Sequence, residues 1–430
     1  MTSNSGGNNA EHLVRAVGLR GIIALTINGT IGAGIFTLPA SAAAILGNFS
    51  PVAFVATGFF VICILLCFVE LGSRYDRTGG AYLYATEAYP PIISFLIGWM
   101  YFLARLTSTA ALAGALPSFL EFFVPLAPLR QKILTITVIA ILGLVNIRGI
   151  KISSKLINFF AVSKVLPLTL LIVVGLFVLH RYPPLTLGSA PIEPFARTVL
   201  LAMFVFSGFE IVPVPAAEIV RPEKTIPRGL LIGTGMTILI YFLIQIVSVT
   251  VTPGLASYKA PLTQTAQILM GTRGAALLSA AAILSTLGTM MAVILVGPRI
   301  LYAMAIGNQM PGVFKSIHPE YNTPTVAIVL FIVLAMVISV SGSFTMLATL
   351  SAMARMITYI GTAGALLILR KKLPQRPGFL IAGGPMIPIL TIVISSCLLL
   401  AASKIQWITG LSAVIVGLLL YGITLAARRS

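Results

Sequence analysis

Charge is scarce in this sequence. Of its 430 residues only 9% are charged, ten are Asp or Glu, three are His and three are Cys, whereas 58% are hydrophobic. The mean hydropathy is +1.04, and soluble globular domains do not have that balance. The patterns HExxH, CxxC and GxxxxGK[ST] do not occur, and the three histidines lie far apart. The sequence therefore predicts no enzyme, no metal site and no cofactor.

The basic residues far outnumber the acidic ones, 28 to 10, which gives a formal net charge of +18. Such an excess can indicate nucleic-acid binding, but here the Lys and Arg residues are scattered through short loops, so we expect no nucleic-acid partner. If the N-terminus is in the cytoplasm, most of these basic residues fall in cytoplasmic loops. This bias predicts a multi-pass protein of the plasma (inner) membrane with both termini in the cytoplasm.

Apolar runs of membrane-spanning length cover nearly the whole chain. A helical span needs about 20 such residues, so the sequence predicts an all-α polytopic membrane protein with about twelve transmembrane helices in the lipid bilayer. The first residues are polar, and the first apolar run is too long for a signal peptide. We expect spans at roughly 21–46, 51–72, 91–123, 131–148, 156–180, 196–217, 228–252, 273–306, 325–342, 345–369, 385–403 and 405–427.

Two of these spans contain helix-breaking residues. The first carries glycines between Thr30 and Gly34, and the sixth carries Ser207 and Gly208, followed by Pro213 and Pro215. Interrupted spans five apart are typical of a five-plus-five inverted repeat, in which the binding site lies between the breaks. We therefore expect a cytoplasmic tail over 1–20, one repeat over 21–181, a second over 182–372, and two additional helices with a short cytoplasmic C-terminus over 373–430.

The first break exposes backbone groups inside the membrane, where they are tolerated only in protein or around a cavity. The amides of Gly32, Ala33 and Gly34 begin the second half-helix and suit an anion, whereas the Thr30 carbonyl ends the first half-helix and suits a cation. An α-amino acid carries both charges close together. The alternative interpretation is that the small residues only allow close helix packing.

Several motifs together resemble one family. They are ELGSR at 70–74, TGGAYLY at 78–84, the glycine-broken TIGAGIF at 30–36 and AAEIVRPEKTIPRG at 216–229. This set resembles the amino acid-polyamine-organocation (APC) superfamily of transporters over about residues 15–376. The segments 105–109, 163–167 and 316–324 are similar to its L-type amino acid transporter branch. The resemblance implies a secondary transporter that moves amino acids, with neutral L-amino acids favoured, by alternating access.

The resemblance also implies roles for residues of the sixth span. It makes Phe204 an aromatic lid, with the carbonyls of Phe204 and Ser207 beside Gly208 completing the ammonium site, although a phenylalanine in a span also serves as core. Glu210 is an ionisable group at mid-membrane and therefore a functional candidate. It could carry a proton, help to close a gate, attract a cationic side chain, or be a structural carboxylate. Its candidate partners are the intramembrane arginines Arg105, Arg299 and Arg355.

Lys164 lies deep in the fifth span. By the resemblance, its ammonium stands where sodium-coupled relatives of this fold hold a sodium ion, between the first, fifth and eighth helices. The hydroxyls of Ser285, Thr286 and Thr289 are the expected neighbours. Two other interpretations are a lysine that carries a transported proton and a lysine that extends to the membrane interface.

The predicted function is sodium-independent exchange, proton-coupled symport or uniport of amino acids. The alternatives are a cationic amino acid or polyamine transporter, with Glu210 as its counter-charge, and a non-transporting amino acid sensor. The sequence departs from the L-type pattern at Thr109 and in the eighth span at Met290 and Met291. The two methionines are bulkier than the residues usual in that branch and would narrow the side-chain pocket if they face it. The loop 124–130 has no cysteine, so we expect no disulfide-linked accessory subunit.

Overall fold

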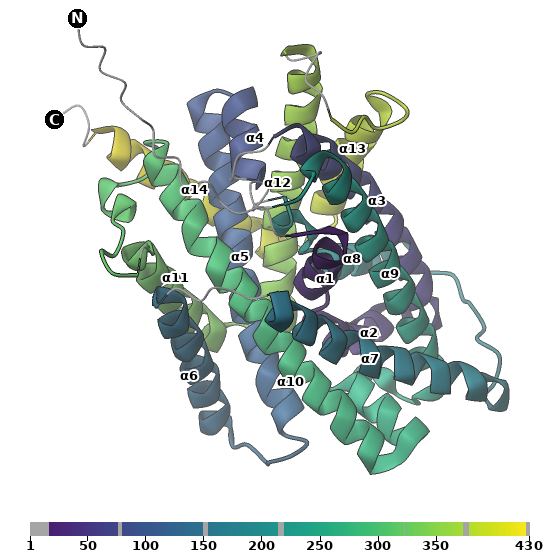
Figure 1. Ribbon diagram of the computed structural model, residues 1–430. Helices are drawn as coiled ribbons and strands as arrows, with labels where there is room; N and C mark the ends of the chain where they lie inside the picture. Colours follow the sequence, from purple (N-terminus) through teal and green to yellow (C-terminus); the bar gives the residue numbers. More distant parts are fainter. Residues whose placement is uncertain are drawn as a thin grey trace, which may run out of the picture.

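The computed structural model describes residues 17–75, 80–148, 154–213, 219–321, 323–372 and 378–426, and the side chains of these residues other than 154–158. The expected tail over 1–16 and Pro215 of the sixth-span break lie outside this part. The described chain is helical, apart from one isolated bridge between Val17 and Ile219 (Figure 1). Its α-helices are α1 (Leu19–Thr30), α2 (Gly34–Leu46), α3 (Ser50–Arg74), α4 (Gly80–Ala88), α5 (Pro91–Leu120), α6 (Pro128–Ile147), α7 (Ser154–Val178), α8 (Ile192–Phe206), α9 (Pro222–Val251), α10 (Pro261–Ile306), α11 (Thr325–Ser341), α12 (Phe344–Lys372), α13 (Met386–Leu400) and α14 (Lys404–Ala426).

Eight helical runs in the described residues are long and apolar enough to cross a membrane, which confirms an all-helical membrane protein. The first, sixth, ninth and eleventh of the twelve expected spans are not among these runs. The runs of α2 and α3 join as Gly34–Arg74, α11 and α13 have only 17 and 15 residues, and the first and sixth expected spans are broken into shorter pieces. The number twelve and the inverted repeat stay predictions.

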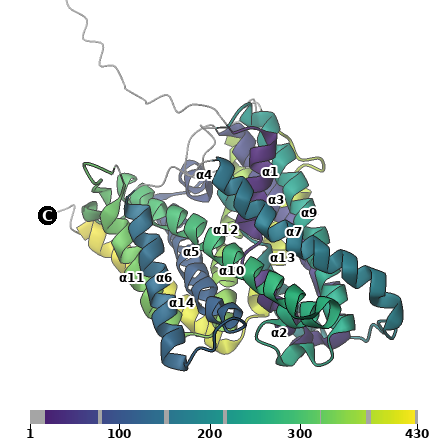
Figure 2. The ribbon, with the colours of Figure 1, turned by 60° about the horizontal axis from the view of Figure 1, so that its bottom comes forward.

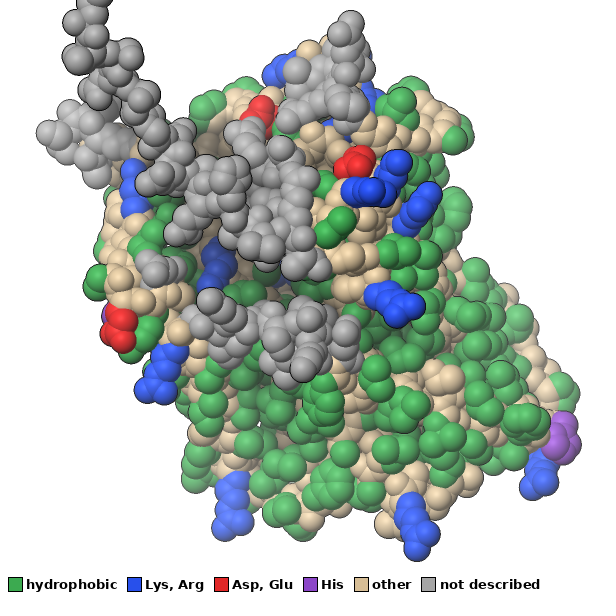
Figure 3. Space-filling model, in the orientation of Figure 1, with side chains coloured by type: hydrophobic (Ala, Val, Ile, Leu, Met, Phe, Trp, Pro, Cys, Tyr) green, Lys and Arg blue, Asp and Glu red, His purple; other side chains and the backbone are tan. Residues whose placement is uncertain are grey.

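Burial separates the central helices from those that face lipid. In the most apolar stretches of α5 and α12, 72% of residues are buried, against 17% in α6 and 11% in α14. In Figure 2, α6, α11 and α14 lie together along one side of the bundle. Hydrophobic side chains form a broad band across the lower part of Figure 3, with Lys and Arg side chains above and below it. Apolar area on this scale fits a lipid environment.

The two broken elements lie at the centre of the bundle. Figure 1 shows α1 and α8 in the middle of the bundle, where α1 contacts the turn Phe209–Ile211 that follows α8, and α9, α3 and α12 pack around them. α1 packs against α7 and α9, α2 packs against α8, and α5 packs against both α10 and α12. The longest helices therefore form a frame that covers the interrupted backbone, as the membrane interior requires.

A buried carboxylate fixes one end of this frame. Glu70, in the last turn of α3, is fully buried and accepts hydrogen bonds from Arg370 of α12 and from the Ile381 amide at 3.1 Å. It also pairs with Arg74 at 2.7 Å, and the Ser73 hydroxyl accepts the Phe379 amide at 2.8 Å. The ELGSR segment thus joins α3, α12 and the chain that leads into α13.

Replacing Glu70 should strongly destabilise this end of the bundle. Glu70→Ala leaves the buried Arg74 and the largely buried Arg370 without a counter-charge, which typically costs about 3–5 kcal/mol. The matched control is Glu193→Ala, because Glu193 pairs with Arg197 at the surface, where such a pair contributes about 0–1 kcal/mol. Thermal unfolding of both variants in detergent measures the difference. Equal melting temperatures for Glu70→Ala and the wild type would contradict this assignment.

Candidate functional site

The first break lies between α1 and α2. α1 ends at Thr30, Ile31 is extended, and α2 begins at Gly34. Among the described residues, no acceptor is found for the amides of Gly32, Ala33 and Gly34. A side chain at Gly34 would meet Val205, since an added Cβ would lie 2.7 Å from its Cγ2. Glycine therefore allows the break to approach α8 closely.

The second break follows α8. This helix ends at Phe206, Ser207 is extended, and Gly208 has a φ of +126°, which L-residues with side chains rarely adopt. An added Cβ on Gly208 would lie 2.2 Å from the carbonyl oxygen of Gly29. The two breaks, almost 180 positions apart in sequence, therefore touch backbone to backbone.

A cavity lies between the two breaks. The cavity has a volume of about 20 Å³. One water molecule needs about 10–15 Å³ on the same scale, so this conformation has room for water but not for a whole amino acid. Substrate entry requires the lining side chains to move apart. The lining residues are Gly29, Thr30, Gly32, Gly34, Arg105, Ser108, Leu112, Phe204, Val205, Ser207, Gly208, Thr289, Val293 and Arg355.

The carbonyls around the cavity are partly engaged. The Thr30 carbonyl accepts a hydrogen bond from the Tyr241 hydroxyl at 3.1 Å, and the Phe204 carbonyl accepts one from the Ser207 hydroxyl at 2.6 Å. Each carbonyl oxygen has two lone pairs and can accept a second donor. The buried Thr30 hydroxyl has no partner among the described residues and is a further polar group at the cavity.

Phe204 separates this cavity from a larger one. Its ring meets the ring of Phe344 edge to face, with centroids 5.8 Å apart and an interplanar angle of 81°. Phe344 lines a second cavity of about 760 Å³, which also includes Glu121 and Lys259. These two charged residues belong to the side of the protein that the loop charges predict to face outside. The aromatic pair therefore lies between the small central cavity and an outer vestibule.

Lys164 of α7 is fully buried against the first break. Its Nζ donates to the carbonyl of Asn28 at 2.9 Å and to the Thr289 hydroxyl at 3.0 Å. The Ser285 hydroxyl donates to the Ile31 carbonyl at 3.0 Å. The ammonium therefore lies between α1, α7 and α10, with oxygen ligands of the kind that a small cation takes.

Thr286 requires a correction. Its hydroxyl donates to the Ala282 carbonyl at 2.6 Å within α10 itself, so it does not take part in the Lys164 cluster. Ser285 lies there instead, because neighbouring residues of a helix point in directions about 100° apart. Asn28 and Tyr241 were not predicted from the sequence, although a polar residue inside an apolar span is the signal that could have indicated both.

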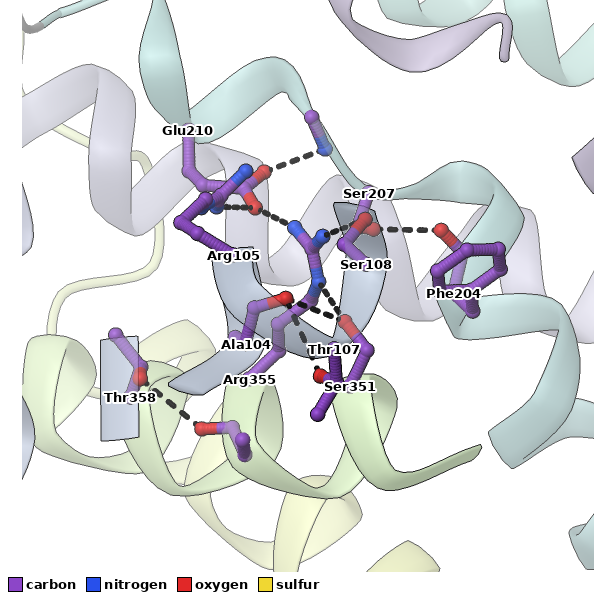
Figure 4. Close-up of polar contacts among 12 residues, drawn as sticks. Ala104, Arg105, Thr107, Ser108, Phe204, Ser207, Glu210, Ser351, Arg355 and Thr358 are labelled. Atoms are coloured by element: carbon purple, nitrogen blue, oxygen red, sulfur yellow. Dashed lines mark hydrogen bonds and ion pairs between the residues drawn. The ribbon is translucent and has the colours of Figure 1, made fainter. Parts of the chain in front are cut away.

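Glu210 forms a buried ion-pair cluster with two arginines (Figure 4). Its Oε1 accepts hydrogen bonds from both Arg105 of α5 and Arg355 of α12, and its Oε2 accepts the Gly208 amide at 2.7 Å. All three side chains are at most 3% exposed. The carboxylate thus joins the second break to α5 and α12. Arg299 lies elsewhere and donates to Asn146 at 3.0 Å.

The family assignment comes from comparison with known proteins. A family model described as "Amino acid permease" matches residues 17–425.

The chain belongs to the amino acid permease family.

This result confirms the APC resemblance, and the permease is accordingly a membrane transporter and not an enzyme. It is 28% identical to the serine/threonine exchanger SteT of Bacillus subtilis, over 88% of this chain and 89% of the relative. It is 26% identical to the branched-chain amino acid permease BcaP of the same organism, over 96% and 93%. It is also 24% identical to the mouse cationic amino acid transporter 4, over 84% of this chain and 61% of that protein.

Substitution of Gly208 should disable the site. Gly208→Ala places a Cβ against the Gly29 carbonyl at a backbone angle that alanine avoids, so the two breaks must move apart. We expect substrate binding to fall at least about tenfold, the equivalent of about 1.4 kcal/mol. Gly235→Ala is the control, because Gly235 lies in α9 with nothing within 4 Å of an added Cβ. Ligand-induced thermal shifts compare the two, and equal shifts would argue against the site.

Proposed function

We propose that the permease is a sodium-independent secondary transporter of L-amino acids that works by alternating access. One observation carries the proposal: two helix breaks face each other across a central cavity, and the amides of 32–34 have no acceptor among the described residues. A helix start with unpaired amides binds anions, and a helix end with exposed carbonyls binds cations. The amino acid backbone matches both.

The substrate backbone would bind at the two breaks as follows. Its α-carboxylate accepts hydrogen bonds from the amides of Gly32, Ala33 and Gly34. Its α-ammonium donates to the carbonyls of Thr30 and Phe204, each of which already accepts one hydroxyl. Phe204 covers the bound substrate as a lid, which is how the family resemblance interprets this position.

Lys164 supports independence from sodium. Its ammonium already contacts the Asn28 carbonyl and the Thr289 hydroxyl, groups that could otherwise bind a metal cation. Two positive charges would not share this buried position. Obligatory exchange and proton-coupled symport both remain compatible with a fixed ammonium, and the transport measurement below distinguishes them.

The charges at the cavity argue against cationic substrates. Glu210 was the one expected counter-charge for a lysine-like or polyamine substrate, and it already pairs with two guanidinium groups. The permease therefore transports amino acids without a positive side chain. This class includes the neutral L-amino acids that the resemblance favours and that the names of SteT and BcaP indicate for those relatives.

The architecture of the proposal is the five-plus-five inverted repeat. The facing breaks of α1 and α8, which belong to the first and sixth expected spans, support repeats over 21–181 and 182–372 and two additional helices over 373–430. The location of the basic loops supports both termini in the cytoplasm of a plasma or inner membrane. The permease is proposed to work without a disulfide-linked subunit.

Flux into proteoliposomes tests the function. Vesicles preloaded with unlabelled amino acid are compared with empty ones, with and without an inward proton gradient, in sodium-free buffer. Uptake only into preloaded vesicles indicates an exchanger, and accumulation in empty vesicles that depends on the gradient indicates a symporter. Binding without any flux would instead indicate the non-transporting sensor and refute the proposal.

Removing the Lys164 ammonium should stop transport. Lys164→Ala removes the charged donor of the Asn28 carbonyl, which then keeps only the Thr289 hydroxyl at 3.3 Å, and removes the lysine's contacts with α1 and α10. We expect flux to fall by about 100-fold or more, since two hydrogen bonds from a charged group, each worth about 1.5–3 kcal/mol, are lost. Lys404→Ala, at an exposed position at the start of α14, is the control. Unchanged flux in Lys164→Ala, with normal size-exclusion behaviour, would show that the lysine is peripheral.

A further inference from the structure

The charges that line the central cavity are all of one sign. Two guanidinium groups, those of Arg105 and Arg355, reach the cavity wall, and no described Asp or Glu side chain does. Glu210 lies behind them and supplies one negative charge for the two. Lys164 is itself positive and supplies no counter-charge; its ammonium bonds the Asn28 carbonyl and the Thr289 hydroxyl. The cavity wall therefore carries one uncompensated positive charge.

A neutral substrate does not remove this imbalance. The α-carboxylate and α-ammonium of an amino acid cancel each other and are used at the two helix breaks. A buried, unpaired guanidinium inside a membrane protein is costly, and such charges are almost always paired. The missing negative charge is therefore expected to arrive with the substrate side chain or as a separate small anion.

The Nε of Arg105 has no partner among the described residues, whereas Arg355 has weakly held donors beside Ser108. One nitrogen of Arg355 bonds Glu210, whereas its contacts to the hydroxyls of Ser108 and Ser351 are both long, at 3.3 Å. A carboxylate would replace these weak neutral contacts with charge-assisted ones. Ser108 also lines the cavity and can donate its own proton to the same carboxylate. Arg105, by contrast, lies against the Tyr101 ring at 4.7 Å.

The lining of the cavity brings the first break and Arg355 to one small space. The amides that would hold the α-carboxylate belong to the first break, and the apolar side chains of Leu112 and Val293 line the cavity with them. Arg355 and Ser108 contact the same small space. A side chain of one or two methylene groups that ends in a carboxylate can therefore contact the break and the arginine together.

We propose that the permease selects amino acids with a side-chain carboxylate, the dicarboxylic amino acids, and that Arg355 and Ser108 bind that carboxylate. This inference rests on the proposed transport function and specifies its substrate class. Arg355 is then a specificity-determining residue. The carboxylate of Glu210 offsets one of the two positive charges. The other positive charge is left for the substrate carboxylate.

Exchange in proteoliposomes tests this assignment. Vesicles are preloaded with L-aspartate, and the uptake of labelled L-aspartate or labelled L-serine is measured. In a second assay, unlabelled L-aspartate is added outside to compete with the uptake of labelled L-serine. We expect aspartate to exchange and to inhibit serine uptake. Arg355→Gln should weaken aspartate binding by about 10- to 100-fold more than it weakens serine binding, because only aspartate loses a hydrogen bond between charged groups. Arg355→Lys keeps the positive charge but not the paired donors of a guanidinium, so its aspartate affinity should fall between those of the wild type and Arg355→Gln.

The controls separate the outcomes. Arg299→Gln removes a largely buried arginine that bonds Asn146 instead, and should leave the ratio of aspartate to serine affinity unchanged. Serine exchange without any inhibition by aspartate, or an equal loss for both substrates in Arg355→Gln, would overturn the inference and leave the transport function intact. Exchange of neither amino acid would also overturn the inference, and the flux measurement described above, made with other neutral amino acids, tests the transport function separately. Serine exchange that requires chloride would assign the missing charge to an inorganic anion and also overturn the inference.

Discussion

The contact between the two interrupted helices is the constraint on which the rest of the structure depends. A helix that stops inside a bilayer leaves amides and carbonyls that lipid cannot satisfy. In the permease, Gly208 lies directly against Gly29, so each break covers part of the other. The surrounding helices α5, α9, α10 and α12 then exclude lipid from both. What remains unpaired is a small set of groups that suits a zwitterion.

The charged residues inside the membrane stabilise these breaks and also bias what can bind there. Lys164 contacts the carbonyl groups that end α1, and Glu210 contacts the amide that follows the break in α8. Each charge is thus paired with backbone that would otherwise be exposed. Because Glu210 faces two arginines, the same arrangement leaves a positive charge at the cavity wall.

The compact cavity and the wide vestibule indicate how alternating access would begin. The Phe204 and Phe344 rings lie between the central cavity of about 20 Å³ and the second cavity of about 760 Å³. Two rings in edge contact are held by a weak interaction, worth about 0.5–1.5 kcal/mol beyond area burial. Separating this pair breaks no hydrogen bond or ion pair, whereas separating the buried ionic clusters that hold the frame breaks several.

The sequence by itself determined the membrane class, the helical fold and the positions of both breaks. These depend on local properties: the hydropathy of a run, the conformational freedom of Gly32, Gly34 and Gly208, and the cost of an ionisable group in an apolar segment. It also identified Lys164, Glu210 and Arg105 as candidates. Each can be recognised without knowing which residues lie beside it.

Only the tertiary structure decided the partners. The sequence could not choose among Arg105, Arg299 and Arg355 for Glu210, and it could not separate Ser285, which faces the break, from Thr286, which does not. A shift of one residue turns a helical side chain by about 100°, and apolar spans carry no strong pattern that fixes this rotation. Packing against neighbouring helices fixes it, and those contacts join residues more than one hundred positions apart.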